Sequence, residues 1–129
     1  MNMKVKNITL LNFVNSALVM KKLPTKLSFA IAINADEANK KVKLYDEERK
    51  KLAEKMAKKD EEGNPVIEND HYIFEDENAW DEVMRELLDT EVEVAMTTVT
   101  LDDVAKCDNP EFDTLTIPEL SVIKFMIEK

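Results

Sequence analysis

The stretch PTKLSFAIAINADEANKKVKLYDEERKKLAEKMAKKD, residues 24–60, decides the fold because it predicts one long helix. Pro24 suits a first helical turn, where its missing N–H would have no partner anyway. Gly63 is the only glycine of the chain and Pro65 follows it, a pair that typically ends a helix. The predicted helix of about 36 residues would span roughly 54 Å, longer than a small domain is wide.

Mostly apolar side chains recur at steps of three and four along this stretch and form one stripe on one helix face. The stripe contains Leu27, Ala30, Ile31, Asn34, Ala38, Val42, Tyr45, Arg49, Leu52 and Met56. Residues 27–33 also alternate large apolar with small side chains, as a strand does. Length and the absence of a breaker before Gly63 favour the helix over the strand.

The residues before the long helix predict a short edge strand followed by a second helix. Residues 3–6 alternate apolar side chains with lysines, which guard exposed sheet edges. Asn7 is a suitable N-cap for a helix over residues 8–21. Only Leu23 and Pro24 would then connect the two helices, and so short a connection predicts an antiparallel helical hairpin.

The residues after Gly63 predict a mixture of short strands and helices. Residues 66–74 predict a hairpin that turns at Asn69 and Asp70, which tolerate positive φ. Asp76 is the predicted cap of an amphipathic helix over residues 77–90, and residues 91–98 alternate like a strand with one wet face. Capping-box spacing starts a short helical turn at Thr100 and a final helix at Thr116 that reaches the end of the chain.

These elements predict an α+β fold: a helical hairpin with one long helix, a small mostly antiparallel sheet and two further amphipathic helices. The length of 129 residues predicts a single domain, with the helical hairpin over residues 7–62 and an acidic α+β part over residues 63–129.

The formal net charge of −9 conceals an asymmetry between the two halves. Residues 1–60 hold 14 basic and 7 acidic residues, a net charge of +7, whereas residues 61–129 hold 4 basic and 20 acidic residues, a net charge of −16. The simplest interpretation is that the acidic half folds back onto the basic half. The alternatives are a basic face for nucleic acid and an acidic face that imitates it. Only two arginines are present, which argues against direct nucleic-acid binding.

The inventory of reactive residues predicts a protein that is not an enzyme and holds no cofactor and no metal. His71 is the only histidine and Cys107 the only cysteine, so no zinc motif is present. One glycine cannot build a phosphate-binding loop. A single cysteine fits a reducing cytoplasm, and no apolar run is long enough to predict a membrane helix.

Two surfaces are predicted to make contacts with other molecules. Carboxylates on the helix over residues 77–90 and the following strand form an acidic surface for a partner, namely Asp81, Glu82, Glu86, Glu91 and Glu93. The far end of the long helix extends beyond the reach of the first helix, so its apolar stripe predicts self-association as a homodimer through Val42, Tyr45, Leu52 and Met56.

Three segments resemble small uncharacterised proteins from phages and prophages of Gram-positive bacteria. They are KKDEEGNPV at residues 58–66, the acidic helix and EVEV strand at residues 80–94, and TIPEL with the following helix at residues 116–128. The resemblance implies a viral, intracellular, non-enzymatic protein. The leading hypothesis is an interaction protein that binds and modulates a host or phage protein, such as a nucleic-acid-handling or defence protein. The alternative is a structural or assembly protein of the virion.

Overall fold

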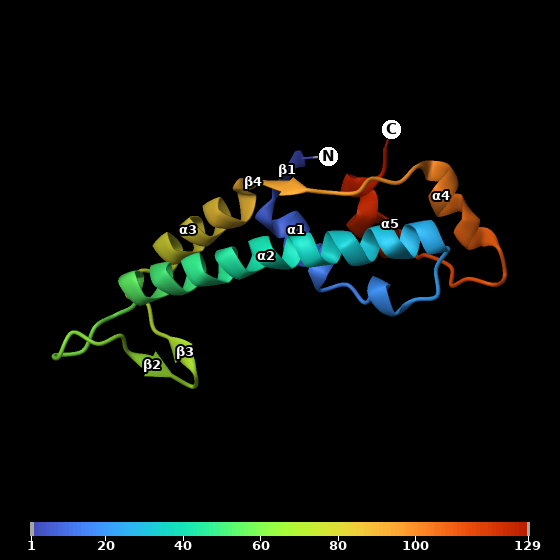
Figure 1. Ribbon diagram of the computed structural model, residues 1–129. Helices are drawn as coiled ribbons and strands as arrows, with labels where there is room; N and C mark the ends of the chain where they lie inside the picture. The colour runs from blue at the N-terminus through green and yellow to red at the C-terminus, as the bar shows by residue number, and fades with distance from the viewer. Residues whose placement is uncertain (1, 129) are drawn as a thin grey trace.

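A 32-residue helix, α2 (Thr25–Met56), runs along the length of the computed structural model, which describes residues 2–128 (Figure 1). The prediction that residues 27–33 are helical is confirmed, and Pro24 is the N-cap residue. The predicted end at Asp60 is wrong. The helix stops at Met56 because the backbone becomes extended at Ala57 and pairs with Phe74 in an isolated β-bridge.

The other elements are shorter than α2. In chain order they are β1 (Asn2–Lys6), α1 (Asn7–Val14), the 3-10 helix η1 (Leu18–Met20), β2 (Ile67–Glu68), β3 (His71–Tyr72), α3 (Glu77–Asp89), β4 (Glu91–Ala95), α4 (Leu101–Ala105), η2 (Lys106–Asp108), α5 (Ile117–Ile123) and η3 (Lys124–Met126). The predicted α+β class with one long helix is confirmed.

The strands form two separate antiparallel pairs instead of one small sheet. β1 pairs with β4, joining the start of the chain to residues 91–95, and β2 pairs with β3 as the predicted hairpin. Asn69 and Asp70, with φ of 50° and 65°, form its turn, because two-residue hairpins need positive φ at both central positions. Gly63, with φ of 83°, lies in the loop before this hairpin and not at a helix end.

The first helix is shorter than predicted, and Asn7 has a different role. α1 ends at Val14, so residues 15–24 form a long connection containing η1, in place of a tight turn. Lys6 occupies the N-cap position without a side-chain hydrogen bond. The buried Asn7 side chain instead donates to the carbonyl oxygen of Leu87 at 2.8 Å, which ties the start of α1 to α3.

The three predicted caps of the C-terminal half are confirmed, but the final helix ends early. Asp76 accepts from the N–H of Ala79 at 3.0 Å, and both Thr100 and Thr116 form complete capping boxes. α5 ends at Ile123 and gives way to η3, after which Ile127 pairs in parallel with Val99. That pairing requires extended backbone and prevents the helix from reaching the end of the chain.

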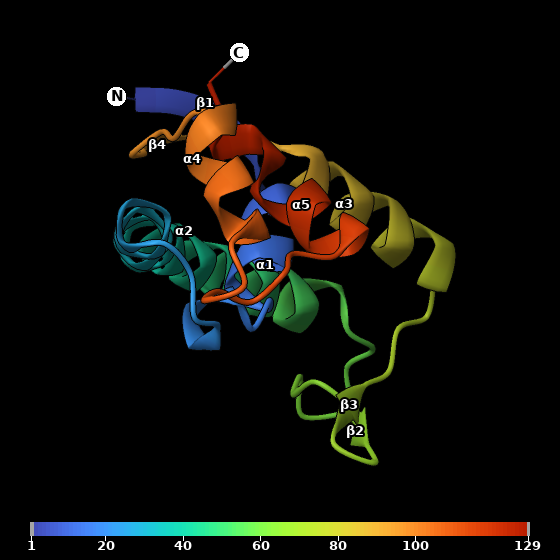
Figure 2. The ribbon, with the colours of Figure 1, turned by 90° about the vertical axis from the view of Figure 1, so that its right-hand side faces the viewer.

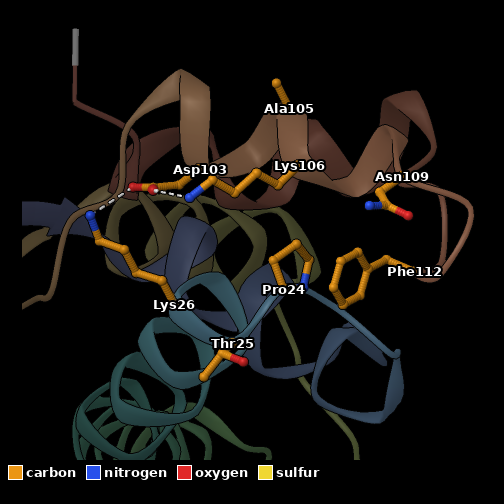
Figure 3. A pocket seen from close by; sticks show the side chains of 8 residues that line it. All are labelled: Pro24, Thr25, Lys26, Asp103, Ala105, Lys106, Asn109 and Phe112. Atoms are coloured by element: carbon orange, nitrogen blue, oxygen red, sulfur yellow. Dashed lines mark ion pairs between the residues drawn. The ribbon is translucent and has the colours of Figure 1, made fainter.

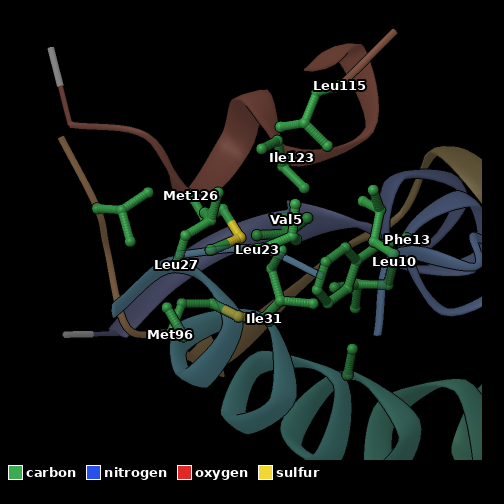
Figure 4. Close-up of a cluster of buried hydrophobic side chains, with 14 of the residues drawn as sticks. Val5, Leu10, Phe13, Leu23, Leu27, Ile31, Met96, Leu115, Ile123 and Met126 are labelled. Carbon is green, nitrogen blue, oxygen red and sulfur yellow. The ribbon is translucent and has the colours of Figure 1, made fainter. Parts of the chain in front are cut away.

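The main hydrophobic core lies against the N-terminal half of α2. Side chains from β1, α1, α2, β4 and the C-terminal segments converge there (Figure 4). Its members from α2 are Leu27, Ala30, Ile31 and Ala38. Beyond Ala38, the buried residues of α2 are Tyr45 and Ala53, which lie outside this cluster. The C-terminal half of α2 is therefore covered by a smaller, separate packing unit formed with α3, and the β2–β3 hairpin projects away from it (Figures 1 and 2).

Asn34 is the fully buried polar residue on the apolar face of α2. Its side-chain amide donates to the carbonyl oxygen of Thr97 at 2.8 Å and accepts from the N–H of Thr97 at 2.7 Å. Buried polar groups are tolerated when they are hydrogen-bonded, and here both amide atoms have backbone partners. The pair fastens the segment after β4 to the middle of the core.

We predict that Asn34→Ala destabilises the protein by roughly 1–3 kcal/mol, because both backbone groups of Thr97 lose their partner. Asn39→Ala, on the exposed side of the same helix, is the control and should change stability by less than about 0.5 kcal/mol. Chemical denaturation monitored by circular dichroism measures both. Equal midpoints for the two variants would show that the Asn34–Thr97 hydrogen bonds, called the Asn34–Thr97 clamp below, do not stabilise the fold.

Candidate functional site

The exposed face of α3 carries the acidic residues of the helix that were predicted to bind a partner. Asp81, Glu82 and Glu86 are all exposed, and Arg85 is the one basic residue between Glu77 and Asp89. Within residues 2–128, none of these three carboxylates has an ion-pair partner. α3 therefore presents a negative surface that the basic half of the chain does not neutralise; these three residues are called the acidic face below.

The two acidic residues predicted on the strand are placed differently. In the β1–β4 register, Glu91 lies opposite Lys6 and Glu93 lies opposite Lys4. Lys6 also forms an ion pair with Asp89 at 2.7 Å, and this hydrogen bond, with the attraction of the carboxylate, raises the pKa of Lys6. Glu91 and Glu93 are exposed, but each has a lysine as its cross-strand neighbour. The predicted acidic surface is therefore partly neutralised at its strand end.

A cleft of about 470 Å³, here called the aromatic cleft, adjoins the start of α3. It lies between the C-terminal half of α2 and the β2–β3 hairpin, and its lining includes Arg49, Asp70, His71, Tyr72, Phe74 and Trp80. This volume falls in the range of sites that take a small molecule or one large side chain. Trp80 immediately precedes Asp81, but Glu82 and Glu86 lie about 200° and 240° around α3 from Trp80, so most of the acidic face points away from the aromatic cleft.

Aromatic contacts hold the walls of this cleft in place. The rings of Phe74 and Trp80 are stacked, with centroids 4.4 Å apart and an interplanar angle of 11°. The Tyr72 hydroxyl donates to a carboxylate oxygen of Glu54 on α2 at 3.3 Å. Desolvation and the adjacent carboxylate raise the pKa of Tyr72, which keeps the hydroxyl protonated as a donor. The hairpin is thereby attached both to α2 and to α3.

The aromatic cleft gathers residue types that are scarce in this chain. The only tryptophan, the only histidine, one of two tyrosines and one of two arginines line it. Tryptophan, tyrosine and arginine are also the types that dominate binding energy at protein interfaces. Sequence reasoning missed this cluster because Arg49 and Trp80 fit helix stripes and His71 fits a surface strand. Their rarity was the one signal available in the sequence.

A second cleft, of about 530 Å³, lies beside the N-terminus of α2 (Figure 3). Its polar centre is Asp103, which is only 5% exposed and lies between two lysines. One carboxylate oxygen lies 3.1 Å from Nζ of Lys26 and accepts from the N–H of Thr100 at 2.9 Å, and the other lies 3.9 Å from Nζ of Lys106. These contacts use the carboxylate to join α4 to α2, so its role is structural.

The residues predicted for self-association lie on the face that α3 and the core cover. Tyr45 is buried at 7% exposure, and Val42, Leu52 and Met56 are half-buried. The expectation that this stripe lacks cover within one chain is therefore corrected, because α3 packs along the same half of α2 (Figure 1). Self-association itself stays a prediction, and an exposed surface has to carry it.

Reactive groups are dispersed over the described residues. His71 lines the aromatic cleft, whereas Cys107 is buried in the main core, where desolvation raises the pKa of its thiol. Residues 2–128 contain no cluster of three or more histidine, cysteine, aspartate or glutamate side chains suited to a metal ion. None of the helices described there has the length and apolarity needed to span a membrane.

Comparison with known proteins gives no relative from which a role could be transferred. No protein-family model, no curated protein and no solved structure matches the chain. The acidic face and the aromatic cleft are therefore the features of the molecule that indicate a role.

We predict that Asp103→Asn lowers stability at neutral pH and flattens its acid dependence. The hydrogen bond from Thr100, with Lys26, lowers the pKa of Asp103 to about 2, below the ordinary value of about 3.9. A carboxylate with a lowered pKa contributes stability that is fully present above the unfolded-state pKa and is lost as pH falls through the folded-state pKa. The contribution should therefore disappear between about pH 4 and pH 2.

Denaturation midpoints measured from pH 7 to pH 2 test this, with the exposed neighbour Asp102→Asn as the control. If the Asp103→Asn and Asp102→Asn curves are parallel to the wild-type curve over the acid range, the Asp103 contacts do not stabilise the fold.

Proposed function

We propose that this chain is a non-enzymatic interaction protein that binds a basic protein partner through the acidic face of α3. The observation that carries the proposal is that some acidic residues of the C-terminal half are paired with lysines, whereas, within residues 2–128, those of the acidic face are not. Asp89, Asp103 and Glu119 are paired with lysines of the N-terminal half, at distances of 2.7 to 3.1 Å. In the part of the chain that the structure describes, the carboxylates of Asp81, Glu82 and Glu86 have no such partners.

The aromatic cleft supplies aromatic and arginine side chains for buried contacts, which the acidic face lacks. Charge complementarity accelerates association and selects partners, but buried aromatic and arginine contacts supply most of the affinity at interfaces. Trp80, Tyr72 and Arg49 line a cleft at the start of α3, with room for a side chain of the partner. A partner that contacts both regions would have to reach around α3, with basic residues on the acidic face and an apolar side chain in the cleft.

The partner that we propose is a host or phage protein whose activity changes on binding. Nucleic-acid-handling and defence proteins present basic grooves, which fits a surface of this sign. A phage or prophage setting is part of this proposal, and the single buried cysteine is compatible with the host cytoplasm. A role in virion assembly remains the alternative, although no surface described above favours it.

We predict that the triple variant Asp81→Lys, Glu82→Lys, Glu86→Lys folds normally and binds its partner more slowly. None of the three side chains is buried, so the fold should persist. Losing the attractive field should lower the association rate on the order of tenfold at low salt, with a smaller effect at high salt. Paired affinity captures from host lysate identify the partner, and surface plasmon resonance measures the rates.

The control reverses the same amount of charge elsewhere, at the exposed residues Glu61, Glu62 and Glu111. It should bind at a rate closer to that of the wild type, because its reversed charges lie away from α3. Should the acidic-face variant bind the captured partner at the wild-type rate in low salt, the acidic face is only solvated surface and the proposed function fails.

A further inference from the structure

Among residues 2–128, no other element covers the outward side of α2 (Figures 1 and 2). In Figure 1 the helix lies in front of α1 and α3, and in Figure 2 the same side forms the edge of the molecule. Residues at steps of three and four form one stripe on this side: Phe29, Ile33, Glu37, Lys40 and Leu44, called the outer stripe below. It is distinct from the face holding Val42 and Tyr45, which packs inward.

The outer stripe exposes large apolar side chains although most of the C-terminal part of α2 is charged. Phe29 is 67% exposed and Leu44 is 57% exposed, while Ile33 between them is half-buried. Single exposed apolar residues are common on proteins. Two exposed and one half-buried apolar side chains share one stripe of the longest helix, with an acid and a base between them, and this pattern can be tested for a matching surface.

Residues 33–44 of the outer stripe are complementary to the same residues of a second, antiparallel copy of α2. Around a two-fold axis that passes between Ala38 and Asn39, an antiparallel second copy of α2 places Ile33 opposite Leu44 and Glu37 opposite Lys40, because the members of each pair are equally far from the axis. Each of these contacts occurs twice. Glu37 and Lys40 already pair within one chain at 3.0 Å, so in the dimer four alternating charges would surround the axis.

We propose that the outer stripe is an interface for a second copy of this chain, in antiparallel orientation. A parallel arrangement would instead place Glu37 against Glu37 and Lys40 against Lys40, and like charges at contact distance are unfavourable. The charges therefore select the orientation, and the flanking Ile33 and Leu44 supply the apolar burial. Phe29 lies one turn beyond Ile33, and the same axis places it opposite Glu48 of the partner helix, so the self-matching part of the stripe is residues 33–44.

The interface is small and leaves the proposed partner-binding surface open. Residues 29–44 span roughly 24 Å of helix, so the buried area lies at the low end for specific dimers and predicts an equilibrium that depends on concentration. None of the outer-stripe residues lies on α3 or lines the aromatic cleft. Each dimer would therefore carry two acidic faces.

Sedimentation equilibrium tests the dimer. The wild-type chain should approach twice its mass of 14.8 kDa at high micromolar concentration. Leu44→Glu should stay monomeric with an unchanged circular dichroism spectrum, because the side chain is exposed. Ile117→Glu introduces the same charge at another exposed apolar residue and should dimerise like the wild type.

Disulfide cross-linking tests the orientation. A chain carrying Ile33→Cys is mixed with a chain carrying Leu44→Cys and oxidised, with Cys107 left in place because it is buried. Antiparallel pairing predicts a cross-linked heterodimer in the mixture and little product from either variant alone. A monomeric wild type, self-cross-linking of Ile33→Cys, or a dimer that yields no mixture-specific product would each overturn the proposal.

Discussion

The length of α2 is the constraint on which the rest of the structure depends. A helix of 32 residues extends roughly 48 Å, whereas α1, with 8 residues, covers about 12 Å of it. No other element is long enough to bury the apolar stripe of α2 alone. The chain therefore covers the stripe in two sections, with β1, α1, β4 and the C-terminal segments at one end and α3 at the other.

The two sections differ in physical character, and the difference suggests a division of roles. The N-terminal section contains the main core, the Asn34–Thr97 clamp and the inter-half ion pairs of Lys21 and Lys26. The far section has few fully buried side chains and collects the aromatic cleft and the acidic face. Surfaces that bind partners are commonly built on less stable regions supported by a rigid scaffold. The outer stripe of α2 contains no residue of α3. A dimer formed through it would therefore leave the acidic face open.

Local signals in the sequence predicted local structure well. The cap at Asp76, the two capping boxes and the Asn69–Asp70 turn each depend on residues within a few positions of one another. The errors arose where distant segments decide the outcome. α2 ends at Met56 because residues 57–59 pair with residues 65 and 74, and Glu91 and Glu93 lie opposite lysines that are far away in sequence. The aromatic cleft joins three segments whose patterns, taken separately, indicate only ordinary helix and strand faces.

Native-state hydrogen exchange along α2 tests the central claim, that one helix serves as the axis of a stable core and of a separate, weaker packing unit. Amides of residues 30–38 should exchange only through global unfolding, because the main core covers them. Amides of residues 50–56 and of the β2–β3 hairpin should exchange faster, through a shared local opening with less exposure of surface to denaturant. Equal protection with equal denaturant dependence along the whole helix would contradict the account.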